Sequence, residues 1–129
     1  MGLVLALAPP ASAESGNQGA AAAAERWLQL VDNGNYAESW KQAAPVFRDA
    51  VPQAQWEQSA SAARKPLGRL LSRKLKSATP RTELPGVPDG SYVVIEFESS
   101  LENKKSAVET VTPVLDKDGT WRVSGYYIR

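Results

Sequence analysis

The chain has 129 residues, of which 43% are hydrophobic and 22% are charged, and its formal net charge at pH 7 is +1. This length and composition suit one globular domain with one core, and the near-neutral charge gives no strong attraction to nucleic acid or to a membrane. The sequence contains no cysteine and no histidine. That excludes disulfides, thiolate metal sites and every catalytic arrangement built on a serine–histidine or cysteine–histidine pair. We expect no cofactor and no metal.

The first 13 residues have the pattern of a signal-peptide remnant. An apolar run from Gly2 to Ala8 precedes Ala11-Ser12-Ala13, which fits the small-x-small rule for signal-peptide cleavage. The run is too short to span a membrane. We expect residues 14–19 to be a polar, flexible linker and residues 20–129 to be a single domain that is periplasmic or secreted. A disordered tail rich in alanine and proline is the alternative interpretation of this N-terminus.

Three helices are predicted in the first half of the chain. They cover Ala20–Asp32, the segment from the cap residue Asn35 to Pro45, and the segment from Pro52 to Pro66. The first has apolar residues at helical spacing and ends at Asn33-Gly34. Pro45 stops the second, because the residue before a proline is pushed out of the α region, and Pro52 suits the first turn of the third.

Four strands are predicted in the second half, joined as an antiparallel meander. They are Gly68–Thr79, Tyr92–Leu101, Ser106–Leu115 and Thr120–Ile128. The spacing of Leu71 and Leu75 also permits a helix over the first of them, but Gly68 and Thr79-Pro80 bound it as a strand. The predicted hairpin turns are Asn103-Lys104-Lys105 and Asp116-Lys117-Asp118-Gly119, the second because glycine tolerates positive φ.

Two details of the last strands bear on which side chains face inward. Pro113 cannot donate to a strand ladder, so it marks an edge position or a bulge. Alternation in the last strand predicts one face made of Trp121, Val123, Gly125 and Tyr127, with Gly125 marking a bend. Together these elements predict an α+β fold in which three N-terminal helices pack on one face of a four-stranded antiparallel sheet.

Aromatic residues on the predicted helices and strands allow two interpretations. They either fill the core or line a ligand pocket between the helices and the sheet, since each ring buries a large apolar area. The candidates for such a pocket are Trp27, Tyr36, Trp40, Trp56 and Trp121.

Seven basic residues and no acidic residue lie between Arg64 and Arg81. One interpretation is a surface for an anionic polymer or anionic lipid, with Arg64, Arg69, Arg73 and Lys74 as candidates. The other is pairing across the sheet with Glu96, Glu98, Glu102 and Glu109. No aromatic residue interrupts the run, which argues against single-stranded nucleic acid as the partner.

Carboxylates are the only candidates for acid–base chemistry, and they are Asp32, Glu96, Glu98 and Glu109. An enzyme would need one of them inside the apolar interior, where burial raises the pKa of a carboxyl group. Nothing in the sequence identifies one of them as buried, so no catalytic residue is predicted.

Four blocks of sequence carry a family resemblance. They are Trp27-Leu28 with Val31-Asp32-x-Gly34-x-Tyr36-x-x-Ser39-Trp40; Arg64-x-Pro66-Leu67-Gly68; Leu84-Pro85-Gly86-x-Pro88-Asp89-Gly90-x-Tyr92-Val93-Val94-Ile95-x-Phe97; and Glu102-Asn103-Lys104-Lys105-x-Ala107-x-Glu109-Thr110-Val111-Thr112 with Asp118-Gly119-x-Trp121-Arg122-Val123-Ser124-Gly125-Tyr126. Together they resemble the small exported bacterial proteins catalogued as domain of unknown function 4019. That family carries no assigned activity, so the resemblance transfers no site residue. Its order of helices and strands is similar to the NTF2-like and cystatin-like cones, and such folds host enzymes and binding modules alike.

The function that these observations favour is a non-enzymatic binding or interaction module of the bacterial cell envelope. Its partner would be a small molecule or an envelope protein, without nucleic acid and without a membrane span, and a homodimer stays open. Two alternatives remain. One is an enzyme of the NTF2-like type with a buried carboxylate base, and the other is a surface module for an anionic polymer.

Overall fold

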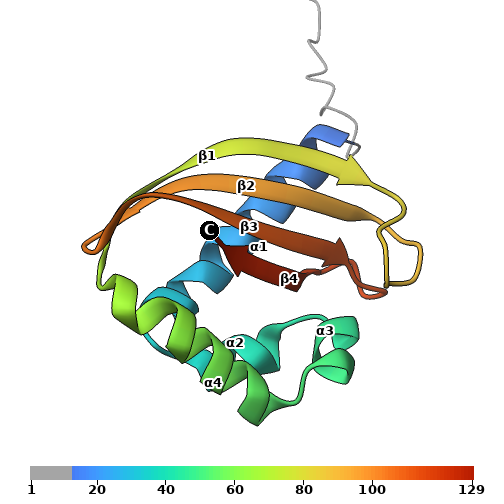
Figure 1. Cartoon of the computed structure of the whole chain (residues 1–129). Coiled ribbons are helices and arrows are strands. Elements are labelled where there is room, and N and C mark those ends of the chain that lie inside the picture. Colours follow the sequence, from blue (N-terminus) through green and yellow to red (C-terminus); the bar gives the residue numbers. More distant parts are fainter. Residues whose placement is uncertain (1–12) are drawn as a thin grey trace, which may run out of the picture.

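A computed structural model describes residues 13–129 of the chain (Figure 1). Four helices, one 3-10 turn and four strands follow one another: α1 Ala13–Asp32, α2 Tyr36–Gln42, α3 Pro45–Ala50, α4 Gln53–Arg64, η1 Lys65–Leu67, β1 Leu70–Arg81, β2 Tyr92–Leu101, β3 Lys104–Leu115 and β4 Trp121–Ile128. Apart from Ala13, the predicted signal-peptide remnant lies outside the described residues.

The predicted α+β class and the antiparallel meander are confirmed. The strands lie in the order β1-β2-β3-β4, and each pair is antiparallel. Helix α1 crosses one face of the sheet and contacts every strand, whereas α2, α3 and α4 lie beyond the edge strand β4, which α3 contacts (Figure 1). Within residues 13–129 we find no helix that combines the length and the apolar character needed to cross a membrane.

The helical half differs from the prediction in two places. Helix α1 begins at Ala13, so the segment 14–19 expected as a flexible linker lies within this helix. The indole of Trp121 lies against it, at only 3.1 Å from where a Cβ on Gly19 would stand, and this packing supports a segment of low helix propensity. Pro45 ends α2 as expected but also opens a further helix, α3, because its fixed φ suits a first helical position.

The strand β1 and the first hairpin turn are tied together at one end of the sheet. The turn is Glu102-Asn103, not Asn103-Lys104-Lys105, because Leu101 already pairs with Lys104. The Asn103 amide donates to the Leu67 carbonyl at 2.8 Å. Gly68 makes this approach possible, since its φ is +77° and a Cβ there would stand 2.9 Å from the Cβ of Glu102.

A register shift next to Gly125 changes which residues of β4 face inward. The shift falls between Thr112 and Pro113 on β3, so that Pro113 pairs with Val123 and Val111 pairs with Tyr126. The expectation that Tyr127 shares a face with Trp121 and Val123 is therefore wrong. Tyr127 is 55% exposed, whereas Tyr126 packs against the core. The cause is the register shift at Pro113, a residue that the sequence marks as an edge position or a bulge, together with the bend predicted at Gly125.

The core lies between α1 and the inner face of the sheet. Its helical side is an apolar stripe on α1, and its sheet side is the buried set of alternating residues on the three later strands. The central members are Ala20, Ala24, Leu28, Val31, Ile95, Phe97, Val111 and Val123. A polar cluster adjoins this core where α1 and α4 end.

Candidate functional site

Four charged side chains meet on the inner face of the sheet, and we call Asp32, Arg64, Arg73 and Glu109 the charge cluster. Arg73 is central, because its Nη1 lies 2.8 Å from Asp32 Oδ2 and its Nη2 lies 2.7 Å from Glu109 Oε1. Arg64 Nη2 donates to Asp32 Oδ1 at 2.8 Å, and its Nη1 lies 3.6 Å from Glu109 Oε2. Two carboxylates thus face two guanidinium groups, and their charges cancel.

Two hydroxyl groups complete the contacts of Glu109. The Ser99 hydroxyl donates to Oε1 at 2.5 Å, and the Tyr126 hydroxyl donates to Oε2 at 2.6 Å. With the charge cluster, these residues come from α1, α4 and all four strands, one residue from each. The network therefore connects two helices and four strands through side-chain contacts at a single position in the fold.

The local structure explains why these side chains converge. Asp32 and Arg64 are the last residues of α1 and α4, so both lie where a helix ends over the sheet. A cation at a helix C-terminus is favoured by the helix dipole, which suits Arg64. Arg73 lies between two irregularities of β1 and pairs with Ser99 of β2, so both face inward.

Burial and neighbouring charges shift the pKa values of Asp32, Arg73 and Tyr126. Glu109 is 0% exposed, and the side chains of Arg64, Arg73 and Asp32 are 4%, 11% and 14% exposed. Burial alone would raise the pKa of Asp32, but hydrogen bonds and charge from Arg73 and Arg64 outweigh it and hold that pKa below its ordinary value. Burial alone would lower the pKa of Arg73, but Asp32 and Glu109 raise it. Burial and the Glu109 carboxylate raise the pKa of Tyr126 far above its ordinary value.

Each oxygen of the two acids already accepts a hydrogen bond. Asp32 Oδ1 accepts from both arginines and Oδ2 accepts from Arg73, while Glu109 accepts from Arg73, Ser99 and Tyr126. Chemically this arrangement suits a neutral structural tie, because buried charges are stable only when paired and hydrogen-bonded. Among residues 13–129, Nε and Nη1 of Arg64 are buried without a hydrogen-bond partner.

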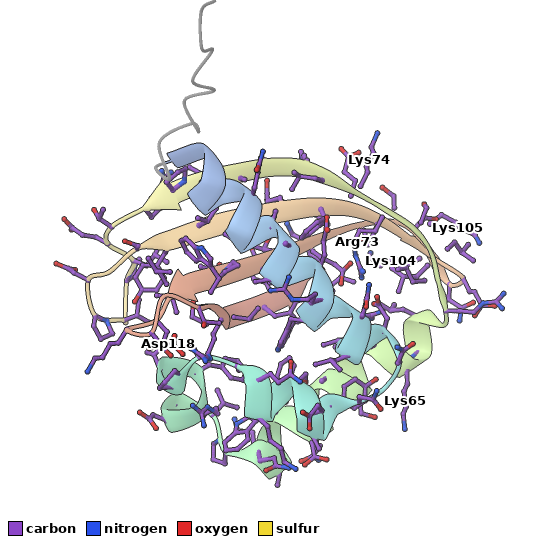
Figure 2. The ribbon with its side chains drawn as sticks, turned by 180° about the vertical axis from the view of Figure 1, so that it is seen from behind. Lys65, Arg73, Lys74, Lys104, Lys105 and Asp118 are labelled. Atoms are coloured by element: carbon purple, nitrogen blue, oxygen red, sulfur yellow. The ribbon has the colours of Figure 1, made fainter. Side chains whose placement is uncertain are left out.

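An open hollow of about 580 Å³ lies at the end of the sheet next to the first hairpin turn, and we call it the basic groove. Its lining is Ser72, Arg73, Lys74, Lys76, Glu98, Ser99, Ser100, Lys105, Ser106, Ala107 and Val108. Lys74 pairs with Glu98, which pairs with Val108, so these side chains share the face of the sheet opposite to Arg73 and Ser99. Figure 2 shows Lys74 and Lys105 projecting outward from the strands and Arg73 on the side of α1.

The aromatic candidates from the sequence fall into a packed set and an open one. Trp27 and Trp56 are buried, and their ring centroids lie 5.7 Å apart. Their indole N–H groups donate to the Ser39 carbonyl at 2.8 Å and to the Ser39 hydroxyl at 2.9 Å. Tyr36 and Trp40 are half-buried against the same cluster. All four side chains thus lie in the core cluster or against it, as the core interpretation expects.

Trp121 is the candidate with the most open surroundings. It is half-buried and lines two surface hollows, of about 400 Å³ and about 490 Å³. Trp27 also borders the first of these, while the second has Tyr92 and Leu115 in its wall. The structure therefore does not bring all five aromatic candidates to one hollow.

The basic candidates are divided between the interior and the surface. Arg64 and Arg73 belong to the charge cluster, so their guanidinium groups are largely buried and already paired with carboxylates. Arg69 and Lys74 are exposed and pair with Glu102 and Glu98 at 3.9 Å and 3.4 Å. Pairing across the sheet is therefore found for three of the four glutamates that the sequence suggested, those at 98, 102 and 109. The remaining one, at 96, pairs with the C-terminal arginine at 3.6 Å.

Sequence reasoning missed two polar members of the network and part of the groove. Ser99 lies in none of the motif blocks, and Tyr126 ends the fourth block without a role assigned to it. The bend predicted at Gly125 is the one signal that the inward-facing residues of β4 change next to it. The sequence pattern places Lys105 in the first hairpin turn, whereas this residue lies on β3. Among residues 13–129, no group of three or more acidic side chains is placed to hold a metal ion.

Comparison with known families gives one match. A family model described as "Protein of unknown function (DUF4019)" matches residues 23–126, which include the charge cluster, Tyr126 and the whole lining of the basic groove. No curated protein matches the chain.

Proposed function

The chain belongs to the DUF4019 family of proteins of unknown function, and we propose that it is a non-enzymatic binding module of the bacterial cell envelope. The observation that carries this proposal is that every carboxylate oxygen of the charge cluster already accepts a hydrogen bond. Its two carboxylates are the acids nearest to the interior, and both are engaged by arginines. The face behind it carries an open groove with polar and basic side chains.

The contacts of Glu109 favour a structural role over a catalytic one. A general base needs a lone pair within hydrogen-bond reach of the proton that it abstracts. Glu109 has no exposed surface, and Arg73, Ser99 and Tyr126 occupy its oxygens. A substrate would have to displace at least one of these donors from a buried position, which leaves a buried polar group unpaired at a cost of about 1–3 kcal/mol.

The same contacts support a binding role for the outer face. The side chains of residues 73 and 74, which are neighbours on β1, point to opposite faces of the sheet. The same holds for residues 98 and 99 on β2 and for residues 108 and 109 on β3. The inward residue of each pair is held by the charge cluster or by a hydrogen bond to it. The strand backbone at these positions is therefore held as well, and with it the position of the outward residue. Such pre-organisation lowers the entropy lost when a ligand binds.

The location in the envelope rests on the sequence pattern of residues 2–13. The test is expression of the full chain in a bacterial host, followed by fractionation and mass measurement of the product. We expect a periplasmic or secreted protein that begins at Glu14. A product that retains residues 1–13 in the cytoplasmic fraction would contradict this part of the proposal.

Binding itself is tested by a thermal-shift and native mass-spectrometry screen against envelope glycans, envelope lipids and small acidic metabolites. A ligand present at a hundred times its Kd stabilises the folded state by about 2.7 kcal/mol, which raises Tm by several degrees in a domain of this size. We expect at least one class to produce such a shift. A screen in which no class shifts Tm or appears in a complex would contradict the proposal.

A second candidate function follows from the burial of Glu109. A carboxylate inside the fold beside a tyrosine is what a small acid–base enzyme requires, and Glu109 accepts a hydrogen bond from Tyr126 at 2.6 Å. The test compares the wild type with Glu109→Gln on a panel of hydrolysis and isomerisation substrates. Turnover by the wild type that is lost in a folded Glu109→Gln protein would favour this candidate.

A further inference from the structure

We propose that the basic groove binds an acidic oligosaccharide, that is, a sugar chain carrying carboxylate, sulfate or phosphate groups. This inference rests on the proposed binding function and names its ligand class. Three kinds of group in the groove lead to it: ammonium groups, hydroxyl groups and one carboxylate.

The ammonium groups give the groove a positive charge that is not neutralised from within. Lys76 and Lys105 line it, both are exposed, and neither has a carboxylate within ion-pair distance among residues 13–129. Lys74 has one partner, Glu98, whose carboxylate lies 3.4 Å away. Arg73 also lines the basic groove, but its guanidinium group is paired with the carboxylates of the charge cluster. The lysines that remain favour a negatively charged ligand.

The lysines stand on both sides of the groove. Lys76 belongs to β1 and Lys105 to β3, with β2 between them. Neighbouring strands lie about 4.8 Å apart, so these two strands are separated by about 10 Å. A chain with repeated negative groups can reach both, and a volume of about 580 Å³ is large enough for more than a single small anion.

The other polar groups of the groove fit a sugar. Ser72 and Ser100 are opposite each other on β1 and β2, and Ser106 lies on β3. Their hydroxyl groups donate and accept hydrogen bonds, as sugar hydroxyl groups do. Glu98 accepts only, so it suits the O–H groups of a sugar and disfavours a ligand that presents only negative oxygens.

Two other anionic partners fit less well. Bases of single-stranded nucleic acid stack on aromatic side chains, and no aromatic residue lines the groove. A membrane surface is flat, whereas the lysines surround a hollow whose only large apolar side chain is Val108. An acidic oligosaccharide is therefore the ligand class that we carry into the test.

The test measures binding of three charged oligosaccharides of equal length to the full chain by calorimetry: a galacturonic acid oligomer, a sulfated dextran oligomer and a phosphorylated maltose oligomer. An uncharged maltose oligomer, anionic phospholipid vesicles and single-stranded DNA are the comparison arms. The groove variant is Lys76→Glu/Lys105→Glu. The matched control is Lys41→Glu/Lys117→Glu, which changes the net charge equally at two exposed lysines outside the basic groove.

We expect at least one charged oligosaccharide to bind the wild type, with an affinity that falls as salt is added. The groove variant should lose about tenfold or more of that affinity, and the control less than about threefold. Failure of all three charged oligosaccharides, equal losses in both variants, or tighter binding of vesicles or DNA would overturn the inference. A ligand from the wider screen that binds the groove variant normally would overturn it too, while leaving the proposed binding function in place.

Discussion

The guanidinium of Arg73 on β1 reaches over β2 to the carboxylate of Glu109 on β3, with Nη2 and Oε1 2.7 Å apart. The same guanidinium donates to Asp32 at the end of α1. Buried ion pairs are costly to form, because both charges leave water, and removal of one partner leaves the other charge uncompensated.

Replacement of Glu109 by Gln should destabilise the fold strongly. The variant keeps the shape of the side chain but leaves the guanidinium groups of Arg73 and Arg64 with one carboxylate between them. We expect the free energy of unfolding, measured in urea, to fall by about 3–5 kcal/mol. The control is Glu98→Gln, which removes the exposed pair with Lys74 and should cost less than about 1 kcal/mol. Similar losses in the two variants would contradict the structural role of the charge cluster.

Asp32 should contribute stability that depends on pH. Its pKa in the folded protein lies below the ordinary value near 3.8, because the arginines outweigh the effect of burial. The contribution is therefore complete above the unfolded pKa and is lost as pH falls through the folded pKa. The measurement compares the unfolding free energy of the wild type and of Asp32→Asn from neutral pH to acid. The difference should be constant above about pH 5 and shrink below the ordinary value. A difference that grows in acid would contradict this.

Tyr126 should resist ionisation. Burial and the neighbouring Glu109 carboxylate raise the pKa of Tyr126 above its ordinary value near 10. The contribution of this tyrosine to stability is present below the unfolded pKa and is lost as the pH rises toward the folded pKa. An alkaline titration followed by phenolate absorbance should show fewer ionised tyrosines in the folded wild type than after unfolding. Burial and Asp89 also raise the pKa of Tyr92, so the folded wild type is compared with folded Tyr126→Phe. Tyr126→Phe should reduce the difference by one tyrosine, and a variant that keeps the full difference would contradict the role of Tyr126.

Gly68→Ala should destabilise the junction of η1 with β1. The backbone there has φ +77° and ψ −160°, a region that is almost restricted to glycine, and the added Cβ would stand 2.9 Å from Glu102 Cβ. We expect a loss of about 2–3 kcal/mol in unfolding free energy. Gly86→Ala is the control, since its φ is +80° but no heavy atom lies within 4 Å of the new Cβ. That variant should cost about 1 kcal/mol, and a ranking in the opposite order would contradict the account of this turn.

The α+β fold class, the strand order and most helix and strand boundaries could be predicted from the sequence. The alternation within β2 and the turn residues Asp118 and Gly119 are local signals, so they can be recognised without knowledge of the rest of the fold. Pro45 shows the limit of such signals. A proline stops the helix before it and also suits the start of another, and only the packing of α3 against β4 decides between these outcomes.

The charge cluster could not be predicted because it depends on long-range geometry. Asp32 and Arg73 are 41 positions apart in the chain, and their meeting depends on where α1 ends over the sheet. The inward position of Tyr126 depends on a register shift between β3 and β4, in which one residue of β4 is skipped and side chains move to the opposite face. Pairing of the basic run with strand glutamates was predicted as an alternative, because opposite charges on neighbouring strands are a local consequence of register.

The measurement that tests the central claim most directly is recovery of the bound ligand after prolonged incubation with the full chain. The ligand from the envelope screen is incubated with wild-type protein, and the complex is observed by native mass spectrometry. The ligand is then released, and its mass is measured by mass spectrometry. We predict a stoichiometric complex and a ligand of unchanged mass, with equal results for the wild type and for any folded variant of Glu109. Conversion of the ligand to a product by the wild type, abolished in Glu109→Gln, would contradict a non-enzymatic binding module.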